Sequence, residues 1–241
     1  MAQLQDPARL GVFADTAFTQ FEQDDELDAL VAQATRLAGT PIALLSLVID
    51  RVQLFRSHVG LPAELAISQA TSRCDSFCQF VVQDEAPLII EEAAGHPRLP
   101  QHLVETYGLR SYMGVPVRYR DQVIGSLCVL DLHPRSFAPD LVPQLESLAR
   151  SITIRLEELA REVTGKPEPM SAVQQAAAIE VSLLEVGPLL RLGQALARGQ
   201  LGPDEFQRAI SVLTELSDVH DDLLAAARRL HRTLLAASTS R

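Results

Sequence analysis

Three cysteines are the residues of this sequence with the most obvious chemical potential. Cys74 and Cys78 are separated by three residues, which places them on one face if the segment is helical, whereas Cys128 lies in an apolar stretch. A zinc site is not expected, because no second pair with zinc-like spacing accompanies them and His96 belongs to a separate loop. We therefore expect reduced, buried and inert thiols and no disulfide framework.

Histidines and carboxylates elsewhere offer other kinds of chemistry. His220 and His231 lie in a stretch with helical periodicity, where a phospho-accepting histidine is conceivable, but no kinase-like sequence follows them, and solvated or interface histidines are the better interpretation. Asp50, Glu91 and Asp131 are potential general acids, yet no nucleophile, base and orienting group accompany them. We assign no catalytic residue and no metal ligand, and we predict that the protein is not an enzyme.

The composition is that of a globular protein with a surplus of acidic residues. The 241 residues carry a formal net charge of −10 at pH 7, and Lys166 is the single lysine. Long-range repulsion therefore disfavours nucleic acid as a partner. The apolar runs are far shorter than the ~20 residues of a membrane span, and the N-terminus lacks the pattern of a secretory signal. We expect a cytoplasmic protein with neither nucleic acid nor membrane as a partner.

The elements that must position these residues alternate between helices and strands. Residues 24–38 have apolar residues at helical spacing behind an acidic start, which predicts a helix ending at Gly39. The apolar run 41–50 predicts a strand buried on both faces, and 52–58 predicts a more exposed partner strand. Residues 60–74 are rich in turn formers and predict an irregular segment.

The rest of this unit continues the alternation and ends in a long helix. Asp75 or Ser76 is a candidate cap for the next short helix, and Gly108 closes another. This order of elements predicts an α+β fold with a central antiparallel sheet flanked by helices. The predicted elements are a helix over 77–84, a strand over 87–92, a helix over 102–108, a hairpin with strands 111–120 and 122–132, and an amphipathic helix over 138–163.

A second, all-helical part follows a linker at residues 165–170. Beyond it the sequence has no strand pattern, and its glycines and prolines leave helical segments near 171–186, 189–198 and 203–236. The last segment is too long to hold its apolar stripe without a partner, so a coiled coil or a helical hairpin is predicted. The domain boundaries are an N-terminal segment at 1–19, the α+β domain at 20–164, the linker at 165–170 and a helical output segment at 171–241.

Several consecutive blocks of the α+β part resemble bacterial GAF domains. The opening FEQDDELDALVAQATRLAGTPIALLSLVIDRVQLFRSHVGL has the helix, apolar strand, D-R turn and second strand ending in a G-L pair that are typical of that family. SFCQFVV, APLIIEEAAGHPRL, GLRSYMGVPVRYRDQVIGSLCVLD and PRSFAPDLVPQLESLA look like its later blocks, in the right order. The sequence is thereby identified as a member of the GAF family with a helical C-terminal extension.

The resemblance implies where a ligand would bind. It places the first and last helices on one face of the sheet and the short helices and loops on the other face, where they enclose a small-molecule pocket. Such folds hold many ligands, so the cofactor or ligand remains unknown, and the apolar candidates have core filling as an alternative role. The positions implied to lie on the pocket side are Phe55, Ser76, Phe77, Cys78, Tyr112, Met113, Val115, Cys128 and Leu130, with His96 and Arg110 near the mouth.

Known GAF subfamilies with particular ligands or chemistry match less well. Reductases of free methionine sulfoxide carry several positioned cysteines, but here only Cys78 falls near such a position. Bilin-binding relatives usually have a cysteine directly followed by histidine, whereas Cys74 and Cys78 precede Asp75 and Gln79. The N-K-x-x-x-F-x-x-x-D/E motif of the cyclic-nucleotide-binding subfamily has no counterpart in this sequence.

The first hypothesis is a non-enzymatic sensory or regulatory signal-transduction protein. It would bind a small molecule and relay the pocket's state through helix 138–163 to residues 171–241, and from there to a signalling partner or a dimer interface. A structural dimerisation scaffold with a collapsed pocket is the alternative, and a thiol redox enzyme is a third. The long helices 138–163 and 203–236 favour a homodimer.

Overall fold

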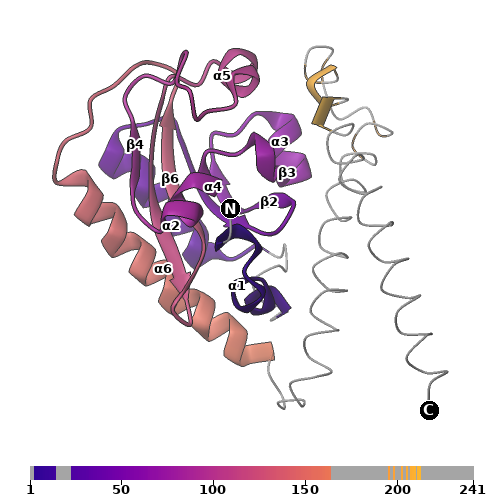
Figure 1. Ribbon diagram of the computed structural model, residues 1–241, viewed down its shortest axis with the longest axis vertical. Coiled ribbons are helices and arrows are strands. Elements are labelled where there is room, and N and C mark those ends of the chain that lie inside the picture. The colour runs from indigo at the N-terminus through magenta and orange to yellow at the C-terminus, as the bar shows by residue number, and fades with distance from the viewer. Residues whose placement is uncertain are drawn as a thin grey trace.

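The computed structural model describes residues 3–14 and 23–163, together with residues 195, 198, 202, 205, 207–209 and 211–212. Its centre is a six-stranded antiparallel sheet with the strand order β3-β2-β1-β6-β5-β4. The strands are β1 (Ile42–Val48), β2 (Val52–Val59), β3 (Ala70–Ser72), β4 (Leu88–Ile90), β5 (Ser111–Tyr119) and β6 (Gln122–Asp131). The predicted α+β fold is confirmed (Figure 1).

Helices lie on both sides of this sheet (Figure 1). The α-helices are α1 (Pro7–Gly11), α2 (Asp25–Ala38), α3 (Ala63–Ser68), α4 (Cys78–Asp84), α5 (Gln101–Tyr107) and α6 (Leu141–Val163). Short 3-10 turns are η1 (Gln3–Gln5), η2 (Val12–Ala14) and η4 (Arg73–Asp75). The predicted helices over 24–38, 77–84, 102–108 and 138–163 correspond to α2, α4, α5 and α6.

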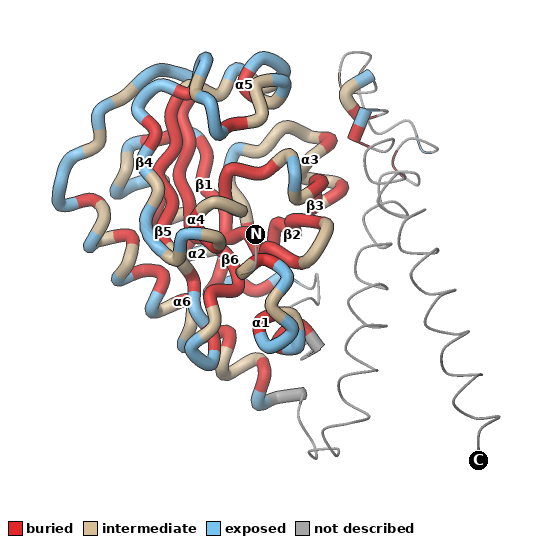
Figure 2. Tube along the Cα trace, viewed as in Figure 1, coloured by how far each residue is buried: buried red, intermediate tan, exposed pale blue. Residues whose placement is uncertain are grey.

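The long helices α2 and α6 pack against each other and against one face of the sheet. Helix α2 begins where Asp24 accepts a hydrogen bond from the Leu27 amide, and it ends at Gly39, whose φ of 61° lies in the left-handed region that glycine adopts without strain. The apolar stripes of both helices close one hydrophobic core, which includes Leu27, Val31, Leu145, Ile152 and Leu156. Figure 2 shows the buried residues running through the strands and along one side of α6.

The opposite face of the sheet carries a second core, with α4 packed on β5 and β6. Alternation along each strand separates the two cores, because neighbouring side chains point to opposite faces. In β1, Leu44 belongs to this second core and Leu45 to the first. This second side of the sheet holds the cavity described below.

The central strand pair is held unusually close at one point. Gly125 in β6 lies opposite Leu47 in β1, and a Cβ atom built on it would stand 1.9 Å from the carbonyl oxygen of Ser46. Only glycine allows this approach of the two backbones. The predicted hairpin of β5 and β6 turns at Arg120 and Asp121, which have positive φ angles of 47° and 63°, as expected of a tight two-residue turn.

Two predictions about the first half of the domain were wrong. The segment 60–74 is not irregular, since it forms α3, β3 and η4. Strand β2 is not the exposed partner of β1, because β3 extends the sheet beyond it and α2 covers one of its faces, where the Ser57 hydroxyl donates to Asp28 at 2.5 Å. A short run of turn-forming residues thus contains an edge strand, which local sequence does not indicate because the strand forms by pairing with β2.

The predicted helical output segment lies mostly outside the described residues. Of the helix predicted over 203–236, residues 205, 207–209 and 211–212 are described and are helical. The linker 165–170 and the helices predicted near 171–186 and 189–198 fall outside the described ranges, apart from residues 195 and 198. Among the described residues, none of the helices combines the length and the hydropathy that crossing a bilayer requires.

Candidate ligand-binding site

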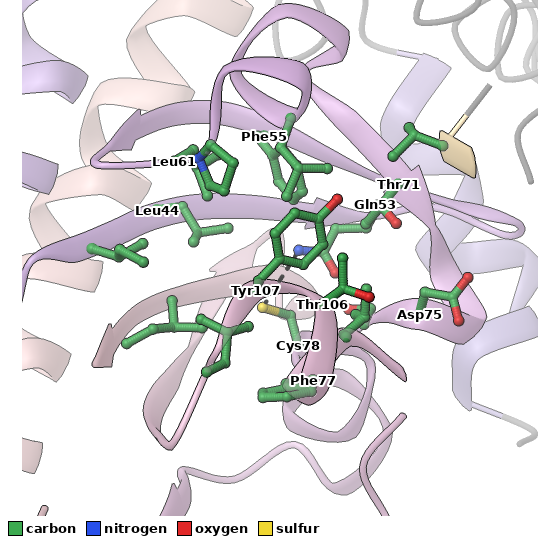
Figure 3. Close-up of a pocket in the computed structure, with 18 of the residues that line it drawn as sticks. Leu44, Gln53, Phe55, Leu61, Thr71, Asp75, Phe77, Cys78, Thr106 and Tyr107 are labelled. Carbon is green, nitrogen blue, oxygen red and sulfur yellow. Dashed lines mark hydrogen bonds between the residues drawn. The ribbon is translucent and has the colours of Figure 1, made fainter. Parts of the chain in front are cut away.

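A cavity of about 520 Å³ opens on the second face of the sheet (Figure 3). Its walls come from β1, β2, β3, β5 and β6, from α3, α4 and α5 with the loops beside them, and from four residues near the C-terminus, Gln207, Arg208, Ser211 and Val212. The volume is within the range of small-molecule sites in proteins. The sheet positions that line it are Ile42, Leu44, Gln53, Phe55, Thr71, Tyr112, Cys128 and Leu130.

The apolar wall follows from the period of two in the strands. Leu44 in β1, Phe55 in β2 and Leu130 in β6 lie on the same face of the sheet and are all buried. Figure 3 shows Leu44, Phe55, Phe77, Thr106 and Tyr107 arranged around a common space. This wall is suited to the hydrophobic body of a ligand.

Polar groups interrupt the apolar wall at two levels. Nearer to solvent, the His102 Nε2 atom lies 2.9 Å from a carboxylate oxygen of Asp75, and both residues line the cavity. Deeper, Gln53 is buried on β2, and its Oε1 atom has no hydrogen-bond partner within the described part of the chain. An unpaired buried acceptor is costly, so this oxygen is a natural contact for a hydrogen-bond donor of a ligand.

Sulfur atoms and hydroxyl groups form the floor of the cavity. The Sγ atoms of Cys78 and Cys128 are 3.6 Å apart, and the Tyr112 hydroxyl lies 3.4 Å from the Cys78 sulfur and 3.4 Å from the Ser126 hydroxyl. Gln53 Nε2 also donates to the Cys78 sulfur, at 3.7 Å. The expected burial of the thiols is confirmed for Cys78 and Cys128, whereas Cys74 is exposed because it lies in the surface turn η4.

The two buried thiols have opposite pKa shifts. Burial raises the pKa of Cys78, but hydrogen bonds from the Cys128 thiol and the Tyr112 hydroxyl stabilise its thiolate and lower the pKa to about 7. Burial raises the pKa of Cys128, and the neighbouring Cys78 raises it further. Burial and the same sulfur also raise the pKa of Tyr112, so its hydroxyl remains a donor. The floor therefore holds one acidic thiol beside two protonated donors.

The C-terminal segment closes one side of the cavity. Gln207, Arg208, Ser211 and Val212 all line it. The Arg208 Nε atom donates to Oε1 of Glu64 at 2.5 Å, and this glutamate in α3 is completely buried. The other oxygen of Glu64 has no hydrogen-bond partner in the portion of the chain described, so the carboxylate depends on Arg208.

The structure sorts the site residues expected from the sequence into three groups. Phe55, Ser76, Phe77, Cys78, Tyr112, Cys128 and Leu130 line the cavity. Met113 and Val115 do not, because they alternate with Tyr112 along β5 and belong to the core beneath α2 and α6. His96 and Arg110 are also absent from its lining: Arg110 pairs with Glu92 at 2.6 Å, and the His96 ring accepts from the Arg98 amide.

Other lining residues were not expected from the sequence. Gln53, Thr71, Asp75, His102, Thr106 and Tyr107 enter the wall from β2, β3, η4 and α5. The period of two in the segment 52–58 could have indicated Gln53, because it shares a strand face with Phe55. The contribution of Gln207, Arg208, Ser211 and Val212 has no signal in the sequence, since it depends on contacts between parts of the chain that are far apart in sequence.

The comparisons with known proteins agree with this architecture. The model of the GAF domain family matches residues 22–156, which is more than half of the 241-residue chain. The chain belongs to the GAF domain family. GAF domains are typical of sensory and signalling proteins. The match lies within the domain predicted over 20–164, and it contains the sheet and all the sheet residues that line the cavity.

Relatives of this GAF protein include a curated protein and several solved structures. A cyclic di-GMP phosphodiesterase of Pseudomonas aeruginosa is 32% identical over 136 residues, which cover 55% of this chain and 22% of the relative. The chain thus spans about a fifth of that protein. Two solved structures are similar in fold. The GAF domain of an Acinetobacter phosphoenolpyruvate-protein phosphotransferase is 22% identical with a TM-score of 0.45, and the match covers 67% of this chain and 94% of that one. A GAF domain/HD domain protein from Geobacter sulfurreducens is 15% identical with a TM-score of 0.48, and the match covers 60% of this chain and 97% of that one.

Proposed function

We propose that this GAF protein is a non-catalytic sensor that binds a small molecule in the cavity and transmits its presence to the C-terminal segment. The observation that carries the proposal is that Gln207, Arg208, Ser211 and Val212 form part of the wall of the cavity itself. A ligand in this space contacts the sensing domain and the output segment at once, so the two are coupled by its binding free energy. The open volume also favours a sensor over a scaffold whose pocket has collapsed.

The lining indicates the chemical class of the ligand. Most of the wall is aliphatic or aromatic, which suits the apolar part of a ligand. The buried Gln53 Oε1 atom, which has no partner among the described residues, can accept a hydrogen bond from a donor group of the ligand. The Asp75 carboxylate near His102 provides a second acceptor. We therefore propose an uncharged or weakly cationic small molecule with a hydrophobic body and at least one N–H or O–H group.

The ion pair between Glu64 and Arg208 provides a route for transmission. A ligand that displaces Gln207 or Val212 from the wall must also move Arg208, which leaves the buried Glu64 without its partner. This route is shorter than one through α6, because α6 packs on the opposite face of the sheet from the cavity. The helix predicted over 203–236 would then change its packing with occupancy.

A homodimer through α6 and the segment 203–236 is the proposed assembly. Ile154 on α6 is 58% exposed, and Leu37 at the end of α2 is also exposed, so the helical face of the domain keeps apolar surface that a second copy would cover. The similarity to a cyclic di-GMP phosphodiesterase supports a signalling context, and no phosphodiesterase activity is proposed for this chain.

Native mass spectrometry of the purified protein tests the binding proposal and the subunit number together. We expect a dimer with a defined additional mass. Two variants on α5 provide a matched pair, because Thr106 and Glu105 are both exposed and only Thr106 lines the cavity. Thr106→Trp should remove the additional mass and Glu105→Trp should retain it. A protein without bound molecule, or an additional mass that Thr106→Trp leaves unchanged, contradicts the proposed site.

Hydrogen exchange of peptides from residues 203–236 tests the transmission. We expect the exchange of these peptides to differ between the protein that carries the co-purified molecule and the protein stripped of it. Arg208→Ala should abolish this difference, whereas Arg198→Ala, at an exposed position, should preserve it. Equal exchange in the two wild-type forms contradicts transmission, even if binding itself is found.

A further inference from the structure

Two thiols from distant parts of the sequence meet at the floor of the cavity. Cys78 is the first residue of α4 and Cys128 lies in the middle of β6, yet their Sγ atoms are only 3.6 Å apart. A disulfide bond requires ~2.05 Å, so the two sulfurs must approach each other by roughly 1.5 Å for the bond to form. Both residues border the cavity, which is large enough to admit a small oxidant.

The surroundings of the two sulfurs differ in a way that assigns them different roles. The Cys78 sulfur accepts hydrogen bonds from the Tyr112 hydroxyl and from Gln53 Nε2, both of which stabilise a negative charge on it. The Cys128 thiol lies 3.8 Å from the Leu44 carbonyl oxygen, an acceptor that favours the protonated form. Cys78 is thus placed as the attacking thiolate, and Cys128 is placed as the thiol that resolves the oxidised product.

We infer that Cys78 and Cys128 are a reversible redox pair that a hydroperoxide entering the cavity oxidises to an intrachain disulfide. The Cys78 thiolate attacks the terminal oxygen of the hydroperoxide, the O–O bond breaks, and the leaving oxygen takes a proton and departs as an alcohol, or as water from hydrogen peroxide. The sulfur of Cys78 is then a sulfenic acid.

In the second step, the Cys128 sulfur attacks the sulfur of this sulfenic acid. The S–S bond forms, the S–O bond breaks, and the hydroxide leaves as water with the proton from Cys128. In sum, the two thiols lose two protons and two electrons, and the hydroperoxide is reduced to an alcohol and water. A dithiol reverses the reaction by thiol–disulfide exchange.

The disulfide would change the site that is proposed to bind a ligand. It ties α4 to β6 across the floor of the cavity, and it removes the thiolate that accepts hydrogen bonds from Tyr112 and Gln53. The redox state of the pair would therefore alter the polarity of the floor. This inference goes beyond ligand sensing and does not depend on it, because the oxidation needs only the two thiols and the cavity.

The test uses the full-length chain carrying Cys74→Ser. Cys74 and Cys78 lie between Arg73 and Arg98 and would share a tryptic peptide, so removing the exposed thiol makes the mapping unambiguous. The reduced protein is treated with hydrogen peroxide, alkylated in denaturant, digested and mapped. We expect a cross-link between the peptides with Cys78 and Cys128, a chain mass lower by ~2 Da, and full reversal by dithiothreitol.

Further variants distinguish the two roles. With Cys74→Ser and Cys128→Ser together, dimedone should trap a sulfenic acid on Cys78 and the disulfide should be absent. With Cys74→Ser and Cys78→Ser together, Cys128 should stay reduced, because its own surroundings favour the thiol. The inference is overturned if both thiols of the folded Cys74→Ser protein stay reduced under excess peroxide, or if Cys78 is oxidised beyond the sulfenic acid while Cys128 remains a free thiol.

Discussion

Asp24 links the two long helices of the domain, and its replacement gives the sharpest test of how they are held together. Its carboxylate caps α2 by accepting from the Leu27 amide at 2.9 Å. The same carboxylate accepts hydrogen bonds from Arg155 of α6, from Nη2 at 2.8 Å and from Nε at 3.1 and 3.4 Å to its two oxygens. Asp24 is 8% exposed, and the Arg155 side chain is 20% exposed.

The expected cost of Asp24→Ala is the sum of these two contributions. Loss of an N-cap costs about 1 kcal/mol. An exposed ion pair contributes up to ~1 kcal/mol, and removing one partner of a fully buried pair costs about 3–5 kcal/mol. The pair with Arg155 is largely but not fully buried, which places it at about 1–2 kcal/mol. The free energy of unfolding should therefore fall by about 2–3 kcal/mol in total.

Urea denaturation at pH 7 of a small series of variants separates the two contributions. Asp24→Ser keeps a capping oxygen and loses the charge, so it should cost about 1 kcal/mol less than Asp24→Ala. Asp25→Ala is the control, because this neighbouring acid is exposed in the first turn of α2 and should cost less than ~0.5 kcal/mol. Equal costs for Ser and Ala would refute the capping role, and a cost for Ala no larger than that of the control would refute both.

The pH dependence of the same variants has a definite sign. Burial raises the pKa of Asp24, but the hydrogen bonds from Arg155 and Leu27 outweigh it and hold the pKa below its ordinary value. A carboxylate whose pKa is lowered by folding stabilises the protein above its ordinary pKa of ~4, and this stabilisation is lost as the pH falls through the folded pKa. The difference between the wild type and Asp24→Ala should therefore be complete at pH 6 and should shrink below about pH 4. A difference that does not change over this range would contradict the assignment.

Three further predictions concern single residues. Gly125→Ala should destabilise the domain by about 3 kcal/mol in urea denaturation, because its Cβ would meet the Ser46 carbonyl oxygen, whereas Gly11→Ala, with no atom within 4 Å, should be nearly neutral; equal effects would contradict this. Gln69→Gly should raise the free energy of unfolding by about 0.5–1 kcal/mol, because Gln69 ends α3 with a φ of 54°, and a decrease would show that its side chain has another role. The rate at which iodoacetamide modifies Cys78, followed by peptide mapping as a function of pH, should reach half of its high-pH value near pH 7, since the pKa of this thiol is lowered to about 7. A midpoint above about pH 8 would contradict the lowered pKa.

The sequence predicts the regular elements because their signals are local. Each of these signals lies within a short stretch of the chain. Examples are the acidic start and terminal Gly39 of α2, the apolar run of β1 and the spacing of apolar residues along α6. Among the missed elements, α3 and β3 have weak local signals, and β3 is a strand only because it pairs with β2. The period of two also places Phe55 and Leu130 correctly once the face of each strand is known.

What the sequence determined by itself is therefore most of the helices and strands, the family, and the part of the cavity that β2, α4, β5 and β6 supply. The tertiary structure alone decided which face of β5 meets the cavity, so that Tyr112 lines it and Met113 does not. It also decided that Cys78 and Cys128, fifty positions apart, come into contact, and that Arg208 reaches the buried Glu64. The physical reason is that such contacts depend on strand register and on chain return over long separations, which leave no trace in local periodicity.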